Sequence, residues 1–138
     1  MKILSRMLIS LVLIVMMLSC STGYISSPEA ERLKKYLQPE NLLELTQNPE
    51  PDIWIIDVRP AGAYRSGHIP SAKNYPSSEI INRLNEIPKS QYLIFYCETG
   101  GRAQSVIKKM EEKDYMLMMN WGGNTRWPYE REKEDKPE

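Results

Sequence analysis

The chain has 138 residues, which is enough for one domain of ordinary size. Its 18 lysines and arginines balance its 18 aspartates and glutamates, so the charge gives no indication of nucleic acid as a partner. A hydrophobic fraction of 41% and a charged fraction of 26% are typical of a globular domain. With a single histidine and two cysteines, the chain offers no residue cluster with metal-binding spacing, and no motif indicates another cofactor.

Residues 1–19 have the pattern of a secretory signal peptide. Lys2 and Arg6 precede an apolar run over residues 7–18, and a small residue follows it. The run is shorter than the ~20 residues that span a bilayer, which disfavours a retained transmembrane helix. We therefore expect the protein to be exported and residues 1–19 to be removed.

The end of this segment, Leu18-Ser19-Cys20, is similar to the lipobox of bacterial lipoproteins. In that family the cysteine becomes the first mature residue and carries lipid. Met17 departs from the usual Leu, Val or Ile, so an ordinary cleavage site beside a cysteine is the alternative. Lipid on Cys20 would anchor the protein to a membrane, facing the periplasm or the cell surface. A Cys20–Cys97 disulfide is disfavoured because it would tie a flexible terminus to the end of a central strand.

The mature chain begins with a short polar segment and two expected helices. Residues 20–27 predict a tether between the lipid and a domain over residues 28–130. Ser27, followed by Pro28 and an acid, is typical of a helix cap, and we expect the helix to continue to Leu37. The break at Gln38-Pro39 separates it from a second short helix over residues 39–45.

The first strand is predicted over residues 53–58, where an apolar run is typical of a strand covered on both faces. The chain then turns away at Arg59, and residues 63–67 are expected to form a short helical turn. A short strand is predicted over residues 73–76. A helix over residues 77–84 opens with a capping pattern and has apolar residues at helical spacing.

The third predicted strand, over residues 92–96, ends abruptly in Cys97. A polar pair, Glu98 and Thr99, and two glycines, Gly100 and Gly101, follow it before a helix expected from residue 103. A loop that opens a helix presents several backbone N–H groups toward one spot, and the helix dipole adds about half a positive charge there. The sequence therefore predicts an anion site, occupied by the Cys97 thiolate or by a small oxyanion beside it.

The last predicted strand covers residues 115–119, and the glycines at 122 and 123 are expected in a loop after it. Residues 131–138 are almost wholly charged and predict a solvated tail. Strands that alternate with helices predict an α/β fold, with a small, mainly parallel sheet and helices on both faces. Cys97, Arg59 and the Gly122-Gly123 loop should then converge on the rim at the carboxyl ends of the strands.

A free thiol of pKa ~8.5 is only a few per cent ionised at pH 7, so Cys97 needs an environment that favours the thiolate. Arg102 is the nearest cation in sequence, with a surface salt bridge as its alternative role. We expect Glu98 to face solvent, because an inward carboxylate would oppose the thiolate. A buried, inert thiol is the alternative for Cys97, against which the two glycines argue. His68 lies in a tight connector, which favours backbone hydrogen bonds over a catalytic dyad.

Several motifs together resemble a rhodanese domain, from about residue 36 to residue 128. They are Asp57-Val58-Arg59, Tyr64, Gly67-His68-Ile69-Pro70, Ala72, Asn74, Cys97-x-x-Gly100-x-Arg102, Gly122-Gly123 and Trp127. The sequence departs from the family pattern at Ala63, Ser71 and Ala103, where glutamate, glycine and serine are usual. The third departure removes a hydroxyl near the loop.

This resemblance implies a sulfurtransferase fold and a persulfide mechanism. Cys97 and Arg102 would be catalytic: the thiolate would take the outer sulfur of a donor such as thiosulfate and pass it to a thiol or cyanide. The backbone of Glu98, Thr99, Gly100, Gly101 and Arg102 would bind the persulfide. The six-residue loop from Cys97 to Arg102 has the sulfurtransferase length, whereas related phosphatases have one residue more.

Three functions stay open at this point: a monomeric, membrane-tethered sulfurtransferase, a non-catalytic binding module, and a persulfide carrier that serves another enzyme. The intact Cys-x-x-Gly-x-Arg loop favours the first and the third. The lack of a second cysteine near Cys97 weakens disulfide exchange by a resolving thiol.

Overall fold

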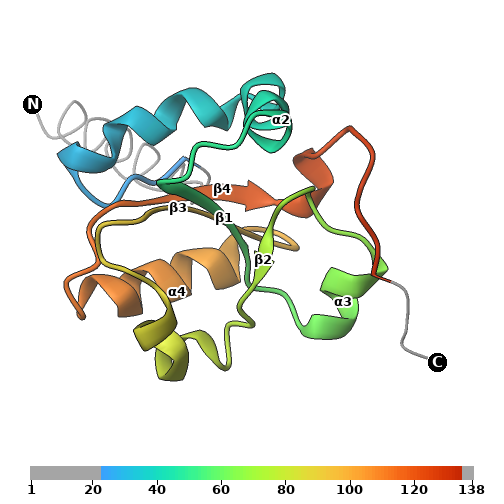
Figure 1. Ribbon diagram of the computed structural model, residues 1–138. Coiled ribbons are helices and arrows are strands. Elements are labelled where there is room, and N and C mark those ends of the chain that lie inside the picture. The colour runs from blue at the N-terminus through green and yellow to red at the C-terminus, as the bar shows by residue number, and fades with distance from the viewer. Residues whose placement is uncertain (1–22, 135–138) are drawn as a thin grey trace, which may run out of the picture.

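The computed structural model describes residues 23–134, so the expected signal peptide and Cys20 lie outside the described residues. Four parallel strands form one sheet in the order β2-β1-β3-β4 (Figure 1). Their bounds are β1 Ile53–Asp57, β2 Lys73–Asn74, β3 Tyr92–Cys97 and β4 Met118–Gly123. The parallel α/β architecture predicted from the sequence is confirmed.

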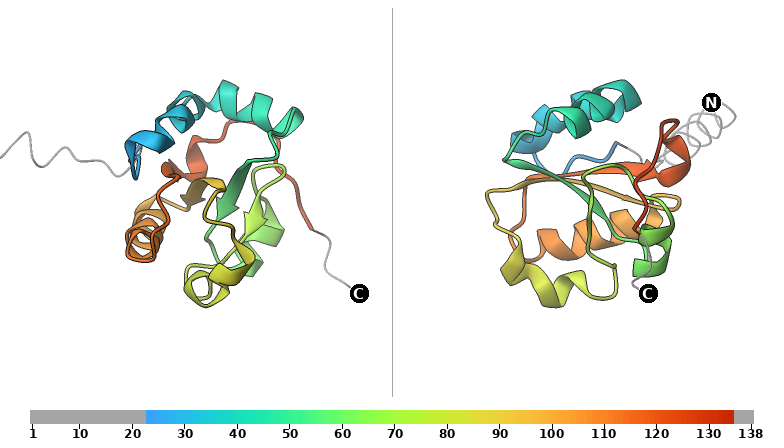
Figure 2. Two further views of the ribbon diagram at one scale, coloured as in Figure 1. Left: turned by 60° about the vertical axis from the view of Figure 1, so that its left-hand side comes forward. Right: turned by 45° about the vertical axis from the view of Figure 1, so that its right-hand side comes forward.

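Helices cover both faces of the sheet (Figure 2). On one face lie η1 (Pro28–Leu37) and α2 (Pro39–Gln47), which are separated at Gln38 as expected. On the other face lie η2 (Ile80–Glu86) and α4 (Gly101–Glu111). The short elements α3 (Ala61–Ser66) and η3 (Asn124–Arg126) complete the fold. No helix among the described residues is long and apolar enough to cross a membrane.

Each layer has its own apolar core, because the strands are buried on both sides. The layer under η1 and α2 buries Ala30, Leu33, Tyr36, Leu42 and Leu45. The layer under α4 buries the predicted amphipathic stripe, namely Ala103, Val106, Ile107 and Met110. The continuous apolar runs of β1 and β3 are thus explained by helices on both faces.

Strand β4 differs from the expectation, because it begins at Met118 and includes both glycines that were predicted in a loop. The residues before β4 form the turn that follows α4 instead: Asp114 has a positive φ of 63°, and the Tyr115 N–H donates to Met110 O. The glycines lie in the strand because the loop after β3 packs against them. A Cβ on Gly123 would lie 2.7 Å from Glu98 O.

The predicted tether is wrong for its described part, because residues 23–27 pair with the exposed edge of β4. The Gly23 N–H donates to Asn120 O, the Asn120 N–H to Tyr24 O, and the Ser26 N–H to Met118 O. The segment runs antiparallel to β4, with a bridge between Ile25 and Met119. It satisfies backbone groups that an edge strand otherwise leaves unpaired.

The charged tail also differs from the prediction, since its described part is held by the backbone. His68 and Glu132 exchange two N–H···O bonds of 2.9 and 3.0 Å, and the Glu134 N–H donates to Arg65 O. The Glu132 and Glu134 side chains stay exposed, as expected. Backbone pairing needs no apolar side chain, so a charged sequence did not exclude it.

Two expected helix starts need correction. Ser27 precedes η1, but its hydroxyl donates to Met116 O and makes no cap bond. The capping pattern at residues 77–78 lies before η2, whose first residue is Ile80. The side chain of Ser27 is therefore used to attach η1 to the segment before β4.

Candidate functional site

Cys97 is the last residue of β3, and its thiol is the only free cysteine side chain among the described residues. The Gly100 N–H donates to Cys97 Sγ at 3.0 Å. The expectation that the two glycines would leave this thiol open is wrong, because the residue is only 1% exposed. It belongs to the apolar cluster under α4, together with Val58 and Ala103.

The loop after Cys97 turns back tightly on β4. Gly100 has a φ of 95°, which favours glycine, and a Cβ there would lie 3.1 Å from Gly122 Cα. Helix α4 begins at Gly101, two residues earlier than expected. The N-terminus of this 11-residue helix therefore lies directly at the thiol, where its dipole favours negative charge.

Arg102 occupies the first turn of α4 and is exposed. Among residues 23–134, its guanidinium makes no hydrogen bond or ion pair, so the surface salt bridge that was its alternative role is not formed there. The structure thus places a solvent-facing cation at the mouth of the loop. Glu98 and Thr99 are exposed as well.

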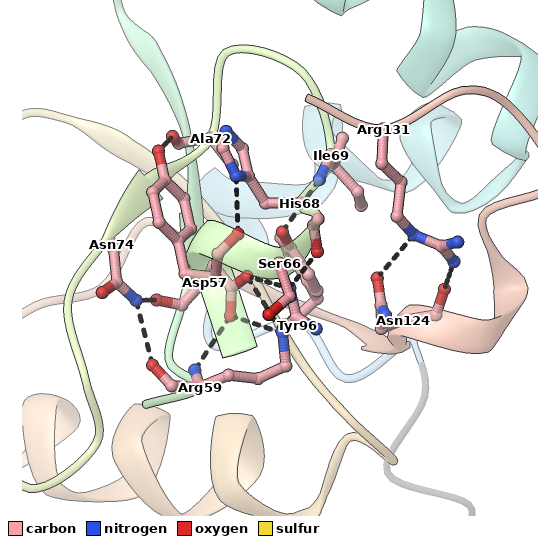
Figure 3. A network of polar contacts seen from close by, with 12 residues as sticks. Asp57, Arg59, Ser66, His68, Ile69, Ala72, Asn74, Tyr96, Asn124 and Arg131 are labelled. Carbon is pink, nitrogen blue, oxygen red and sulfur yellow. Dashed lines mark hydrogen bonds and ion pairs between the residues drawn. The ribbon is translucent and has the colours of Figure 1, made fainter. Parts of the chain in front are cut away.

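Arg59 lies near the rim but is not an open binding group, because it is 4% exposed. Its guanidinium donates to the Asp57 carboxylate at 2.7 to 3.1 Å and to Gly67 O at 2.8 Å (Figure 3). Although burial opposes the charge, the bonds to Asp57 raise the pKa of Arg59. Arg59 Nη1 also lies 3.6 Å from Glu98 Oε2, so it attaches the first residue of the loop to β1.

Glu98 faces solvent, as predicted, but it also contacts Arg59. Its side chain is 51% exposed, as expected, while one carboxylate oxygen reaches back to Arg59. The buried Asp57 side chain already neutralises that arginine. The carboxylate of Glu98 is therefore directed toward the β1 end of the rim.

His68 has the structural role that its sequence context favoured. Its Nδ1–H donates to Tyr64 O at 2.8 Å, and its ring stacks on Tyr64 with 3.7 Å between centroids (Figure 3). Burial raises the pKa of Tyr64 to about 12, so its hydroxyl remains a neutral donor to Ala72 O. The histidine ties α3 to the connector before β2.

The contacts of two residues around the site, Tyr96 and Asn120, were not predicted from the sequence. Tyr96 accepts the Ile69 N–H on its hydroxyl, and its ring lies 5.7 Å from the Arg59 guanidinium carbon. Asn120 is fully buried on β4 and donates to Gly100 O. The one feature of the sequence that could have identified Asn120 is that it is a lone amide residue within an apolar strand. No group of three or more potential metal ligands occurs in residues 23–134.

A family model for the rhodanese-like domain matches residues 38–127. The chain belongs to the rhodanese-like family. It is 30% identical over 77 residues to a sulfurtransferase of Allochromatium vinosum, covering 55% of this chain and 72% of that protein. A putative sulfurtransferase of Bacillus subtilis, YtwF, is 27% identical over 81 residues, or 54% of this chain and 79% of the relative.

Solved structures agree with this assignment. A rhodanese-like domain protein from Staphylococcus aureus aligns with a TM-score of 0.60 at 26% identity, covering 70% of this chain and 95% of that chain. The yeast single-domain sulfurtransferase RDL2 shares the fold, with a TM-score of 0.58 at 20% identity, covering 64% and 84%. The rhodanese-like family and the relatives named as sulfurtransferases support sulfurtransferase activity in general.

Proposed function

We propose that the protein moves sulfane sulfur from a donor such as thiosulfate to a thiol or to cyanide through a persulfide on Cys97. One observation carries this proposal: the Cys97 sulfur accepts the Gly100 N–H at the point where β3 ends and α4 begins. Backbone N–H groups and a helix N-terminus favour a negative charge on that sulfur.

The reaction requires no cofactor in this scheme. The Cys97 thiolate attacks the outer sulfur of thiosulfate, the donor S–S bond breaks, and sulfite leaves with its electron pair. The new Cys97 persulfide is anionic and accepts hydrogen bonds from the loop N–H groups. Cyanide then attacks the outer sulfur, thiocyanate leaves, and the Cys97 thiolate is restored.

Arg102 has the charge and position to attract an anionic donor. It is exposed at the first turn of α4, whereas Arg59 is already paired with Asp57. Because Cys97 is only 1% exposed, the loop that follows it must shift as the donor arrives. Glu98 and Thr99 are solvent-exposed, which favours such a movement.

The test is to incubate the purified full-length protein with thiosulfate, measure its intact mass and then add cyanide. Wild type should gain one sulfur and release thiocyanate, whereas Cys97→Ser should do neither. A gain of sulfur without turnover would support the persulfide carrier instead. If wild type gains no sulfur from any donor, the binding module becomes the better reading.

We propose further that lipid on Cys20 anchors the exported protein to a membrane. Residues 23–27 run antiparallel to β4, so Gly23, the first described residue, lies at the end of the segment that is nearer the carboxyl end of that strand, where the Cys97 loop lies. Such an anchor would hold the sulfur site on the membrane side of the domain. Cys20→Ala should release the protein from the membrane fraction; persistent binding would contradict this anchor.

A further inference from the structure

Asn120 is a buried polar residue in the middle of β4, between Met119 and Trp121. Its amide nitrogen donates to Gly100 O and to Gln104 Oε1, each at 3.1 Å. Its amide oxygen accepts the Gly122 N–H at 3.0 Å. Both donors and the acceptor of this amide are therefore used, which fixes its orientation.

The backbone of Asn120 is held equally firmly from the other side. Its carbonyl accepts the Gly23 N–H at 2.7 Å, and its N–H donates to Tyr24 O at 2.9 Å. The register of β3 and β4 also shifts here, because Phe95 pairs with Asn120 whereas Tyr96 pairs with Gly122. The shift and the N-terminal segment together place the Asn120 amide against the Cys97 loop.

The partner of this amide is the peptide that joins Gly100 to Gly101. Its carbonyl accepts two bonds, one from Asn120 and one from the Gln104 N–H, which is the first hydrogen bond of α4. In a trans peptide the C=O and the N–H point in opposite directions. A carbonyl held toward β4 therefore turns the Gly101 N–H away from β4.

A peptide between two glycines has little steric resistance to rotation. Without a second bond, the Gly100 carbonyl would be held by the frayed first turn of α4 alone. The hydrogen bond from Asn120 ties that turn to the central sheet. It also fixes the loop next to the Gly100 N–H that reaches Cys97 Sγ.

We propose that Asn120 is a positioning residue for sulfur transfer, which holds the Gly100–Gly101 peptide so that the loop N–H groups stay directed at the Cys97 sulfur. The proposal rests on the proposed persulfide chemistry of Cys97. Asn120 acts through Gly100 and does not touch the reacting atoms. The substrate class is the one already proposed, an anionic sulfur donor that reacts with the Cys97 thiolate.

The test is Asn120→Asp in the full-length protein, since aspartate has nearly the same shape and still accepts the Gly122 N–H. Its carboxylate cannot donate to Gly100 O and repels it. We expect kcat for thiosulfate and cyanide to fall about 10- to 100-fold with KM little changed. Iodoacetamide should also alkylate Cys97 more slowly at pH 7, with the midpoint of its pH profile moved upward.

Asn124→Asp is the matched control, because Asn124 is also buried and its amide oxygen accepts from Arg131 and not from the Cys97 loop. Alkylation is read on the Cys97 peptide by mass spectrometry, so it does not depend on turnover. If wild type forms no persulfide, the proposed function fails, while a shifted alkylation midpoint still supports the positioning role.

If Asn120→Asp matches Asn124→Asp in both kcat and alkylation midpoint, the positioning role is overturned even where the melting temperature falls. Should Asn120→Asp not fold, Asn120→Ser removes the amide without adding charge. The same two measurements then decide, with the same expected and contradicting results.

Discussion

Gly123→Ala tests how closely the Cys97 loop packs on β4. Gly123 has an ordinary φ of −95°, so alanine adds no backbone strain, only a methyl group. The new Cβ would lie 2.7 Å from Glu98 O and 3.2 Å from Thr99 Cα. Close C···O contacts are about 3.3 Å, so the loop must move by roughly 0.6 Å.

Overpacking of this kind costs about 1–3 kcal/mol. For a domain of this size, each kcal/mol lowers the melting temperature by about 4 °C. Since the displaced carbonyl belongs to the residue after Cys97, sulfur transfer should fall about 10- to 100-fold. Calorimetry and a thiocyanate assay measure the two effects.

Gly62→Ala is the control for this experiment. Gly62 is exposed in α3, and a Cβ there would have no atom within 4 Å. The substitution should leave activity unchanged and raise stability by up to about 1 kcal/mol, through helix propensity. If Gly123→Ala keeps wild-type melting temperature and activity, the close packing described here is refuted.

Asp57→Asn should destabilise the fold by about 3–5 kcal/mol, measured by urea unfolding, because it leaves the Arg59 charge buried beside a neutral group; an unchanged midpoint would contradict this. Ile107→Ala, at a fully buried position of α4, should cost about 2–5 kcal/mol in the same assay, and a loss below about 1 kcal/mol would show that the site collapses. The Tyr36 hydroxyl bond lowers the pKa of Glu50 below 4.5, so the charged form stabilises the fold above that pH and the effect is lost as the pH falls through the lower folded value. Glu50→Gln should therefore lower the free energy of unfolding at pH 7 by about 1 kcal/mol or less, and not in acid; a pH-independent difference would argue against the ionised form.

Patterns of neighbouring residues predicted most of the elements correctly. The apolar runs of β1 and β3 and the stripe of α4 depend only on strand and helix periodicity, which a sequence displays directly. The position of Cys97 follows from the same patterns, since a strand that meets glycines and a helix must end in a tight loop. The structural role of His68 was also predicted correctly, from its place in a tight connector between two elements.

The incorrect predictions concern the environment of a side chain in the folded protein. Burial of Cys97 depends on α4, which follows it in the sequence, and on the segment after β1, which precedes it; residues of both belong to its apolar cluster. Arg59 was expected on an open rim, but the Asp57 carboxylate two residues earlier folds back to neutralise it. Neither outcome could be predicted from residue type, because a thiol and a guanidinium are stable in either environment when partnered.

The sequence by itself determined the order of strands and helices, the placement of the thiol at a strand end and the family resemblance. These features depend on local periodicity and on short motifs. Only the tertiary structure decided that residues 23–27 lie on β4, that the tail pairs with His68, and that Asn120 reaches Gly100. Backbone hydrogen bonds across sequence separations of up to about 100 residues carry the first two contacts, and such bonds leave almost no trace in the identity of the residues that make them. The third contact is made by the Asn120 side chain, and its partner depends on how the Cys97 loop packs against β4.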